Sequence, residues 1–253
     1  MVKWIHIADV HLGASPDAGD AYSKVRPQEL WDTFVEVIDI CEREQTDLLL
    51  IAGDLFHRQP LKKELKEVDY YFSRLSRTKV VLIAGNHDFL KQDSYYRSFQ
   101  WSSNVYPLFD KEPECVIFED LDVAVTGFSY ESREILTPFD GGIRAEGDAK
   151  YEILLVHGGD EKHLPIQKSL LEKSGFDYIA MGLGRKTPHQ PQRRQRIDRR
   201  LFRSLSRREK IHGRIRRKSQ KKRICRNNYG PQTLSPGHKL PECRSQRDRK
   251  SVV

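Results

Sequence analysis

The sequence predicts an α/β fold, and two features of the apolar pattern carry this prediction. Short apolar runs at residues 48–52 and 80–84 are typical of strands that are buried on both faces of a sheet. Between them, apolar residues recur at helical spacing over residues 61–75. Because residues 2–8 begin the same alternation of strand and helix, the front of the chain is predicted to consist of βαβ units.

The first elements follow from periodicity and from proline. Residues 2–8 are the first expected strand, and residues 9–20 are a loop that contains Gly, Asp and Ser. A surface helix is expected to begin at Pro27, because proline is favoured at a helix start and apolar residues then recur at helical spacing as far as Cys41. The strands at residues 48–52 and 79–84 enclose a second amphipathic helix.

The pattern changes in the second part of the predicted domain, where strands outnumber helices. The expected elements are two strands joined by a tight turn (115–118 and 121–128), a loop rich in Gly and Asp (138–147), a core strand (152–156), a short helix (166–173) and a last strand (176–181). Gly175 is the expected stop signal of the short helix, and the last strand ends at Gly182.

Charge divides the chain into two parts. Residues 184–253 contain 24 Lys and Arg against 4 Asp and Glu, whereas residues 1–183 contain 20 against 32. Residues 188–223 are mainly Arg, Lys, Gln and Ser, and no apolar period persists there for more than a turn. Too little apolar surface is available to offset chain entropy, so we predict a folded domain over residues 1–182 and a disordered basic tail over residues 183–253.

Cysteine usage and hydropathy bear on the cellular compartment. Cys41, Cys115, Cys225 and Cys243 show no close spacing, which is typical of reduced thiols in a cytoplasmic protein. The first residues lead directly into a strand rather than into a signal peptide. No apolar run approaches the roughly 20 residues that span a bilayer. We therefore expect a cytoplasmic protein with no membrane partner.

Residues that suit metal ions follow four of the expected strands. Asp9 and His11 follow the first strand, Asp54 and His57 the second, Asn86 and His87 the third, and His157 follows the strand at residues 152–156. Open α/β sheets place their ligand-binding loops at the carboxyl ends of strands, so we expect these side chains to lie close together. Imidazole favours transition metals and carboxylate suits harder ions, so this set indicates Mn, Fe or Zn rather than Mg alone.

Such a site suits attack on phosphorus. Asp54 is the expected bridging ligand, because one carboxylate can hold two cations roughly 3.5–4 Å apart; such a pair acidifies a bound water and neutralises phosphoryl charge. His87, next to Asn86, is placed to protonate the leaving oxygen. Alone, Gly53-Asp54 is equally compatible with an ordinary turn. We interpret His6 as a core or surface histidine, His163 as a solvated loop histidine, and Asp88 as a cap of the following turn.

In this order and spacing, the polar residues resemble the signature of the calcineurin-like metallophosphoesterases. Within that superfamily, the sequences after the first two strands resemble those of DNA-repair nucleases of the Mre11/SbcD type. The resemblance covers residues 1–182. The matching segments are Asp9-Val10-His11-Leu12-Gly13, Gly53-Asp54-Leu55-Phe56-His57, Gly85-Asn86-His87-Asp88 and His157-Gly158.

The resemblance implies a fold and a metal centre. The implied fold class is α/β (α+β), a four-layer α-β-β-α sandwich in which two mixed sheets are flanked by helices. The implied centre contains two Mn²⁺ ions. By position, Asp9, His11 and Asp54 resemble the ligands of one ion, and Asp54, Asn86 and His157 resemble the ligands of the other.

The resemblance also implies an activity and partners. His87 matches the catalytic histidine, and His57 matches a second histidine that contacts the scissile phosphate. The implied activity is Mn-dependent 3′→5′ exonuclease and single-strand endonuclease action on DNA in double-strand-break repair. The implied partner is a coiled-coil ATPase of the SbcC/Rad50 type, and the nuclease subunit of this type is usually a homodimer.

The chain departs from the family pattern at the end of the last strand. The family has Gly-His-x-His there, whereas Leu183 and Arg185 occupy the two histidine positions in this chain. Each ion would lose one protein ligand, so we predict weak or absent nuclease activity. We predict that a shift of reading frame after codon 182 produced residues 183–253. The alternative is a genuine basic extension that binds nucleic acid through phosphate contacts.

Two other functions remain open at this point. One is hydrolysis of small phosphate esters by the same metal centre. The other is non-catalytic DNA binding through the basic tail, for which a steep dependence of affinity on salt is expected.

Overall fold

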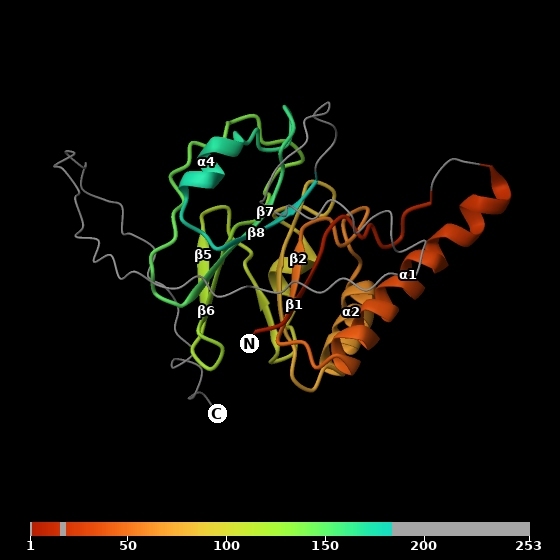
Figure 1. Ribbon diagram of the computed structural model, residues 1–253. Coiled ribbons are helices and arrows are strands. Elements are labelled where there is room, and N and C mark those ends of the chain that lie inside the picture. The colour runs from red at the N-terminus through yellow and green to blue at the C-terminus, as the bar shows by residue number, and fades with distance from the viewer. Residues whose placement is uncertain (1, 16–18, 184–253) are drawn as a thin grey trace.

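Two four-stranded sheets packed face to face, with helices outside them, make up the part of the chain that the computed structural model describes, residues 2–15 and 19–183 (Figure 1). The predicted tail lies outside these residues, apart from Leu183. The elements are β1 (Trp4–Ile7), α1 (Asp20–Arg43), β2 (Leu48–Ala52), α2 (Lys62–Ser73), β3 (Lys79–Ile83), α3 (Tyr95–Ser98), β4 (Val105–Pro107), β5 (Glu114–Phe118), β6 (Val123–Gly127), β7 (Tyr151–His157), α4 (Lys168–Lys173) and β8 (Tyr178–Gly182).

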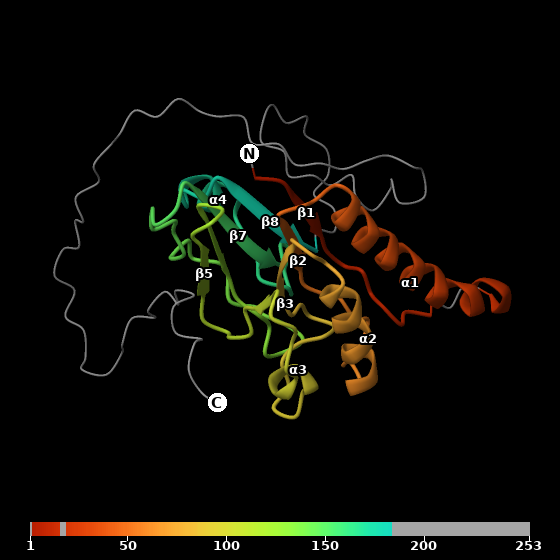
Figure 2. The ribbon, with the colours of Figure 1, turned by 90° about the horizontal axis from the view of Figure 1, so that it is seen from below.

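The order of strands explains where the helices lie. The first sheet runs β1-β2-β3-β4 and every pair in it is parallel. Right-handed crossovers between consecutive parallel neighbours place their helices on one face, and Figure 2 shows α1 and α2 together on the side away from the second sheet. The second sheet runs β5-β6-β7-β8, with β5 antiparallel to β6 and the other pairs parallel. The sandwich is confirmed, but the first sheet is wholly parallel rather than mixed.

Strand β2 shows how the layers are held together. Its five side chains are all buried, because alternate residues face opposite layers. Leu49 and Ile51 belong to the core under α1 and α2. Leu48 and Leu50 belong to the core between the two sheets. A third core, under α4, covers the outer face of the second sheet.

The expected start of the first helix at Pro27 is wrong. Helix α1 begins at Asp20 and contains Pro27 in its second turn. Proline has no N–H to donate to the carbonyl of Ser23, four residues earlier. The Ser15 hydroxyl donates a hydrogen bond of 3.0 Å to that carbonyl instead, so a contact from outside the helix compensates for the proline.

Two short elements, α3 and β4, were not anticipated from the sequence, because three or four residues are too few to show a period. Within the described residues, neither Cys41 nor Cys115 forms a disulfide. Cys41 is buried, and burial raises the pKa of its thiol to about 12.

None of the helices in residues 2–15 and 19–183 combines the length and apolar character needed to cross a bilayer.

Candidate metal centre

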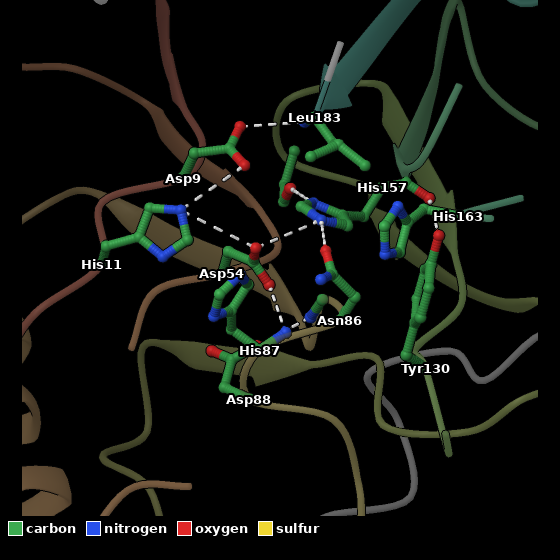
Figure 3. Close-up of polar contacts among 12 residues, drawn as sticks. Asp9, His11, Asp54, Asn86, His87, Asp88, Tyr130, His157, His163 and Leu183 are labelled. Carbon is green, nitrogen blue, oxygen red and sulfur yellow. Dashed lines mark hydrogen bonds and ion pairs between the residues drawn. The ribbon is translucent and has the colours of Figure 1, made fainter. Parts of the chain in front are cut away.

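The carboxyl ends of strands from both sheets meet at one place. Figure 3 shows side chains from the loops after β1, β2 and β3 and from the end of β7 pointing toward one another. The residues named from the sequence as site candidates are all in or around this cluster: Asp9, His11, Asp54, His57, Asn86, His87 and His157.

The loops after β1 and β2 run side by side beyond the ends of their strands. The amide of Asp9 donates to the carbonyl of Gly53 at 3.2 Å, and the amide of His11 donates to the carbonyl of Asp54 at 3.0 Å. Asp9, His11 and Asp54 have φ values of 52°, 53° and 53°. Non-glycine residues rarely adopt this left-handed conformation, and such strain concentrates at functional sites. The local fold therefore holds these three side chains in fixed directions.

Asp54 is the centre of the cluster. Its side chain is fully buried, and its Oδ1 accepts a hydrogen bond of 2.9 Å from the amide of His87. Its Oδ2 lies 3.5 Å from Nε2 of His157 and 3.9 Å from Nε2 of His11. Burial favours the neutral carboxyl, but the neighbouring His157 imidazole holds the pKa of Asp54 below its ordinary value.

His157 crosses from the second sheet to the first. Its Nδ1 lies 2.8 Å from the carbonyl oxygen of Ala52, which can only accept, so Nδ1 carries a proton. Its Nε2 then faces Oδ1 of Asn86 at 2.9 Å. Burial alone would lower the pKa of His157, but the Asp54 carboxylate raises it to about 9. An imidazole whose other nitrogen donates to a backbone carbonyl is typical of histidines that bind metals.

Glycine allows this close approach of the two sheets. A Cβ on Gly182, the last residue of β8, would collide with the carbonyl oxygen of Ala52 and would lie 2.7 Å from Nδ1 of His157. A Cβ on Gly85 would collide with the Asp54 side chain. Only glycine fits at these two positions while the site keeps its present shape.

Leu183 lies at the edge of the same cluster, beside Asp9 (Figure 3). Its amide donates to Oδ2 of Asp9 at 2.8 Å, and its φ is 54°. The structure therefore brings residue 183 to the site, but its side chain offers no donor atom to a metal. Arg185, named with it from the sequence, lies outside the described residues.

Three imidazoles form a group beside Asp54. The ring of His11 is 5.3 Å from that of His57 and 4.7 Å from that of His87, and the rings of His57 and His87 stack at 4.9 Å. Burial lowers the pKa of His11 to about 4, so its ring is neutral at neutral pH. His57 is exposed and His87 half-buried, so both are accessible to a substrate.

Asp88 does not face this cluster. Its buried carboxylate accepts from the amides of Gly85 and Phe56 at 2.8 and 3.1 Å, and from the hydroxyl of Tyr96 at 3.0 Å. These partners differ from the following turn that the sequence indicated. Burial, with a smaller contribution from the charge of Asp54, raises the pKa of Asp88 to about 6. Asp88 therefore ties the loop after β3 to the loop after β2.

The other histidines have local partners. His6 lies between the edges of the two sheets, where its Nδ1 is 3.2 Å from the hydroxyl of Tyr178. His163 is half-buried and its Nδ1 lies 2.8 Å from Oδ1 of Asp160. The first agrees with a core or surface role, and the second is more enclosed than the solvated histidine that was expected.

Two residues that support the site, Tyr130 and Ser129, were not predicted from the sequence. The buried Tyr130 donates its hydroxyl to the carbonyl of His157 at 3.0 Å, which fixes the end of β7. Ser129 accepts from the amide of Ala84 and donates to the carbonyl of Leu108. Neither residue belongs to a recognisable motif, and their adjacency to the functional loops arises only in the folded chain.

The donor set fits a metal ion. Asp54 Oδ2 is buried and makes no hydrogen bond of normal geometry to the described residues; its nearest charged neighbour is the His157 ring, whose Nε2 lies 3.5 Å away. A buried carboxylate oxygen placed in this way favours a cation at the position it faces. Ligand atoms of Asp9, His11 and Asp54 lie within 4.8 Å of one another, as do those of His11, His57 and His87. Mixed carboxylate and imidazole donors suit divalent transition metals. Two groupings of residues that could hold metal ions are thus present.

The chain belongs to the calcineurin-like phosphoesterase family, whose model matches residues 2–204. This membership puts it among hydrolases of phosphate esters that use divalent metals. Like the fold and the donor set, the family match agrees with the resemblance that the sequence motifs indicated.

Individual relatives share a third or less of their residues with the matched part of this chain. The chain is 33% identical over 202 residues to the uncharacterized metallophosphoesterase YhaO of Bacillus subtilis, covering 72% of this chain and 48% of that protein. It is 27% identical over 193 residues to the DNA double-strand break repair protein Mre11 of Saccharolobus solfataricus, covering 72% and 49%. The chain thus spans about half the length of these relatives. The crystal structure of Pseudomonas putida nuclease MPE superposes with a TM-score of 0.30 at 17% identity, over 60% of this chain and 59% of that one.

Proposed function

We propose that this chain is a metal-dependent phosphodiesterase that acts on DNA, with two Mn²⁺ ions as its cofactors. The observation that carries the proposal is the buried Oδ2 atom of Asp54, which lacks a hydrogen-bond partner among the described residues and faces Nε2 atoms of His11 and His157. A bridging carboxylate between two cations accounts for such an atom.

The residues are assigned to two ligand groups. Asp9, His11 and Asp54 would hold one ion, and Asp54, Asn86 and His157 would hold the other. Bound ions supply an acidified water and neutralise charge on the phosphoryl oxygens. The ring of His11 is neutral at neutral pH and can offer one nitrogen to a cation. Nδ1 of His157 donates to the Ala52 carbonyl, so Nε2 is the nitrogen that would bind an ion, with release of the proton that Asp54 favours there in the metal-free chain.

His87 is proposed to protonate the leaving oxygen. Its Nδ1 lies 2.9 Å from the carbonyl oxygen of His57, which can only accept, so Nδ1 donates and Nε2 is the nitrogen left to exchange a proton with a substrate. His57 is proposed to contact the scissile phosphate. Its exposure and its stacking on His87 support this role, because a phosphate near one ring then meets the other.

The proposal that the substrate is DNA rests on the names of similar proteins and not on the geometry of the metal centre. Curated relatives from several archaea carry the name DNA double-strand break repair protein Mre11. By analogy, we propose 3′→5′ exonuclease and single-strand endonuclease action in the cytoplasm, a partner ATPase of the SbcC/Rad50 type and a homodimeric whole protein. Each of these is a property of the longer relatives, of which this chain spans about half.

We propose further that activity is impaired in this chain. Leu183 contributes no ligand where its backbone is held against Asp9, and in the sequence Arg185 replaces the second histidine of the family pattern. A shift of reading frame after codon 182 accounts for both residues and for the change of charge along the chain. Sequencing the coding DNA across codons 175–195 tests this: another frame that reads Gly-His-x-His supports the shift, and its absence in all frames opposes it.

Two measurements test the proposed function. The first is calorimetric titration of the metal-free chain with Mn²⁺, where binding that is lost in Asp54→Asn is expected. The second is hydrolysis of bis(p-nitrophenyl) phosphate and of a single-stranded oligonucleotide, where weak Mn-dependent cleavage of both is expected. Undetectable Mn²⁺ binding together with no hydrolysis of either compound would overturn the proposal.

A second candidate is hydrolysis of small phosphate esters. The family match extends to phosphoesterases in general, and the name of the Bacillus subtilis relative specifies no substrate. Cleavage of the nitrophenyl diester without any cleavage of oligonucleotides would favour this candidate. A third, non-catalytic DNA binding through residues 184–253, predicts that deletion of those residues abolishes binding and that the affinity of the intact chain falls steeply with salt.

A further inference from the structure

A small hollow lies between the two loops that carry His57 and His87. Its volume is about 140 Å³, and the residues around it include Gln59, Leu61, Lys91, Asp93 and Tyr95. Gln59 and Leu61 follow His57 by two and four residues, and Lys91 follows His87 by four. The lining of the hollow therefore comes from the segments that directly follow the two histidines proposed to meet the substrate.

Two hydrogen bonds join the loop that carries His57 to the loop that carries His87. The His87 ring is hydrogen-bonded to the carbonyl of His57, and the side-chain amide of Gln59 donates to the carbonyl of Phe89 at 2.8 Å. A group bound in the hollow would thus be held in a fixed position relative to His57 and His87. Such preorganised positioning is what a substrate subsite requires.

The walls of the hollow suit a flat, partly polar group. Tyr95, on the short helix α3 (Figure 2), is 47% exposed, and Leu61 is 43% exposed. An exposed aromatic ring beside an aliphatic side chain offers a stacking surface for a base, since every base has a π-face.

The charged residues around the hollow favour a base over a phosphate as the group that binds there. Asp93 contributes a carboxylate that repels an anion but accepts hydrogen bonds from the N–H groups of a base. Lys91 is held with its Nζ 5.8 Å from the ring centroid of Phe89, so it offers a cation beside the hollow. A base in the hollow and its phosphate near Lys91 satisfy both charges.

We propose that this hollow is a base-binding subsite for an unpaired nucleotide that neighbours the scissile phosphate, with Tyr95 as the stacking residue. The inference rests on the proposed phosphodiesterase function and adds to it a base-binding subsite with a named stacking residue. A base in a duplex is stacked and paired and cannot enter a lateral hollow without being extruded. The subsite therefore selects single-stranded nucleic acid.

The test compares the binding of two single strands to the full chain. One is a fluorescent oligothymidylate with phosphorothioate linkages, which resist cleavage, and the other is a strand of equal length and charge that carries abasic spacers. With Mn²⁺ present, the wild type is expected to bind the first strand roughly tenfold or more tightly than the second. The abasic strand accounts for affinity that arises from phosphate contacts alone, including contacts from the basic tail.

Variants then locate the effect. Tyr95→Ala is expected to lose most of the preference for bases, and Tyr95→Phe is expected to keep it because stacking does not need the hydroxyl. Tyr70→Ala is the matched control, since Tyr70 is also exposed, at 60%, but lies on α2 outside the lining of the hollow. Thermal unfolding of each variant shows whether it is folded.

Two results would overturn the subsite. One is equal binding of both strands by the wild type, and the other is a preference for bases in folded Tyr95→Ala that matches the preference in Tyr70→Ala. Hydrolysis of bis(p-nitrophenyl) phosphate by the wild type separates the two levels of inference. If the diester is hydrolysed but no preference for bases exists, the subsite fails and the phosphodiesterase proposal stands.

Discussion

Nε2 of His157, the last residue of β7, lies 2.9 Å from Oδ1 of Asn86, in the loop after β3, although the two residues are 71 positions apart and come from different sheets. The same imidazole reaches the carbonyl of Ala52 through Nδ1. One side chain thus joins the ends of β2, β3 and β7. The site therefore depends on how the two sheets pack. Substitutions of single residues in it should show which of them are needed for metal binding and which for folding.

Asp54→Asn is expected to abolish tight Mn²⁺ binding while the fold remains. An asparagine can keep an oxygen where Oδ1 accepts from the His87 amide, but it removes the charge beside His11 and His157. We expect Mn²⁺ affinity to fall by at least about 100-fold, measured by calorimetry. The matched control is Asp160→Asn, because Asp160 pairs with His163 and lies in neither cluster of candidate ligands. Equal affinity in both variants would contradict the bridging role of Asp54.

Leu183→His is expected to strengthen metal binding. Residue 183 already has a φ of 54°, and its amide is anchored to Asp9, so an imidazole there would start from a backbone that is held at the site. We expect a gain in Mn²⁺ affinity of about tenfold or more, with a rise in diester hydrolysis. Leu136→His, which adds an imidazole at a position that is 64% exposed, is the control. No gain over this control would show that Leu183 does not occupy a ligand position.

Asp88→Asn and Tyr96→Phe should destabilise the site loops to different extents. Tyr96→Phe removes one of three hydrogen bonds to the buried Asp88 carboxylate and should lower the free energy of unfolding by about 1 kcal/mol. Asp88→Asn replaces an acceptor of the Gly85 and Phe56 amides by a group with half its acceptor capacity, and should cost about 3 kcal/mol. Urea unfolding measures both, with Tyr70→Phe as the exposed control. The reverse order of the two effects would contradict this account.

His6 should make the domain less stable in acid. Burial lowers the pKa of His6 to about 4, whereas the unfolded chain has the ordinary value of about 6.5. The unfolded state therefore binds more protons, and stability is lost as pH falls from about 6.5 to about 4, by up to about 3 kcal/mol. Urea unfolding at pH 7 and pH 5 should show a smaller difference in His6→Phe than in the wild type. Parallel pH profiles for the two proteins would show that His6 does not titrate in this way.

The sequence predicted which polar residues would lie close together, because apolar runs show where the strands end. Apolar runs mark β2 and β3, and the polar residues after them, Asp54 and Asn86, must then lie at one edge of a parallel sheet. It also predicted the amphipathic helices that cover this sheet. The start of α1 was predicted wrongly from Pro27. The hydroxyl that satisfies the carbonyl left without a donor by this proline belongs to Ser15, which lies outside the helix.

The supporting residues could not be predicted in the same way. Asp88 looked like a local cap, but two of its three partners, Phe56 and Tyr96, come from other segments of the chain. Tyr130 carries no motif and becomes relevant only because β7 ends beside it. Hydrogen bonds between segments that are far apart in the chain produce no repeating pattern in the sequence from which they could be predicted.

The sequence by itself determined the fold class and the identity of the polar residues, because periodicity and strand-end chemistry are local properties. Only the tertiary structure decided how the two sheets meet, with Gly182 against the Ala52 carbonyl and His157 beside Asn86. It also decided that Asp54 keeps an oxygen without a hydrogen-bond partner among the described residues, and that Leu183 faces Asp9. These relationships depend on distances between segments that are far apart in the chain, which only packing fixes.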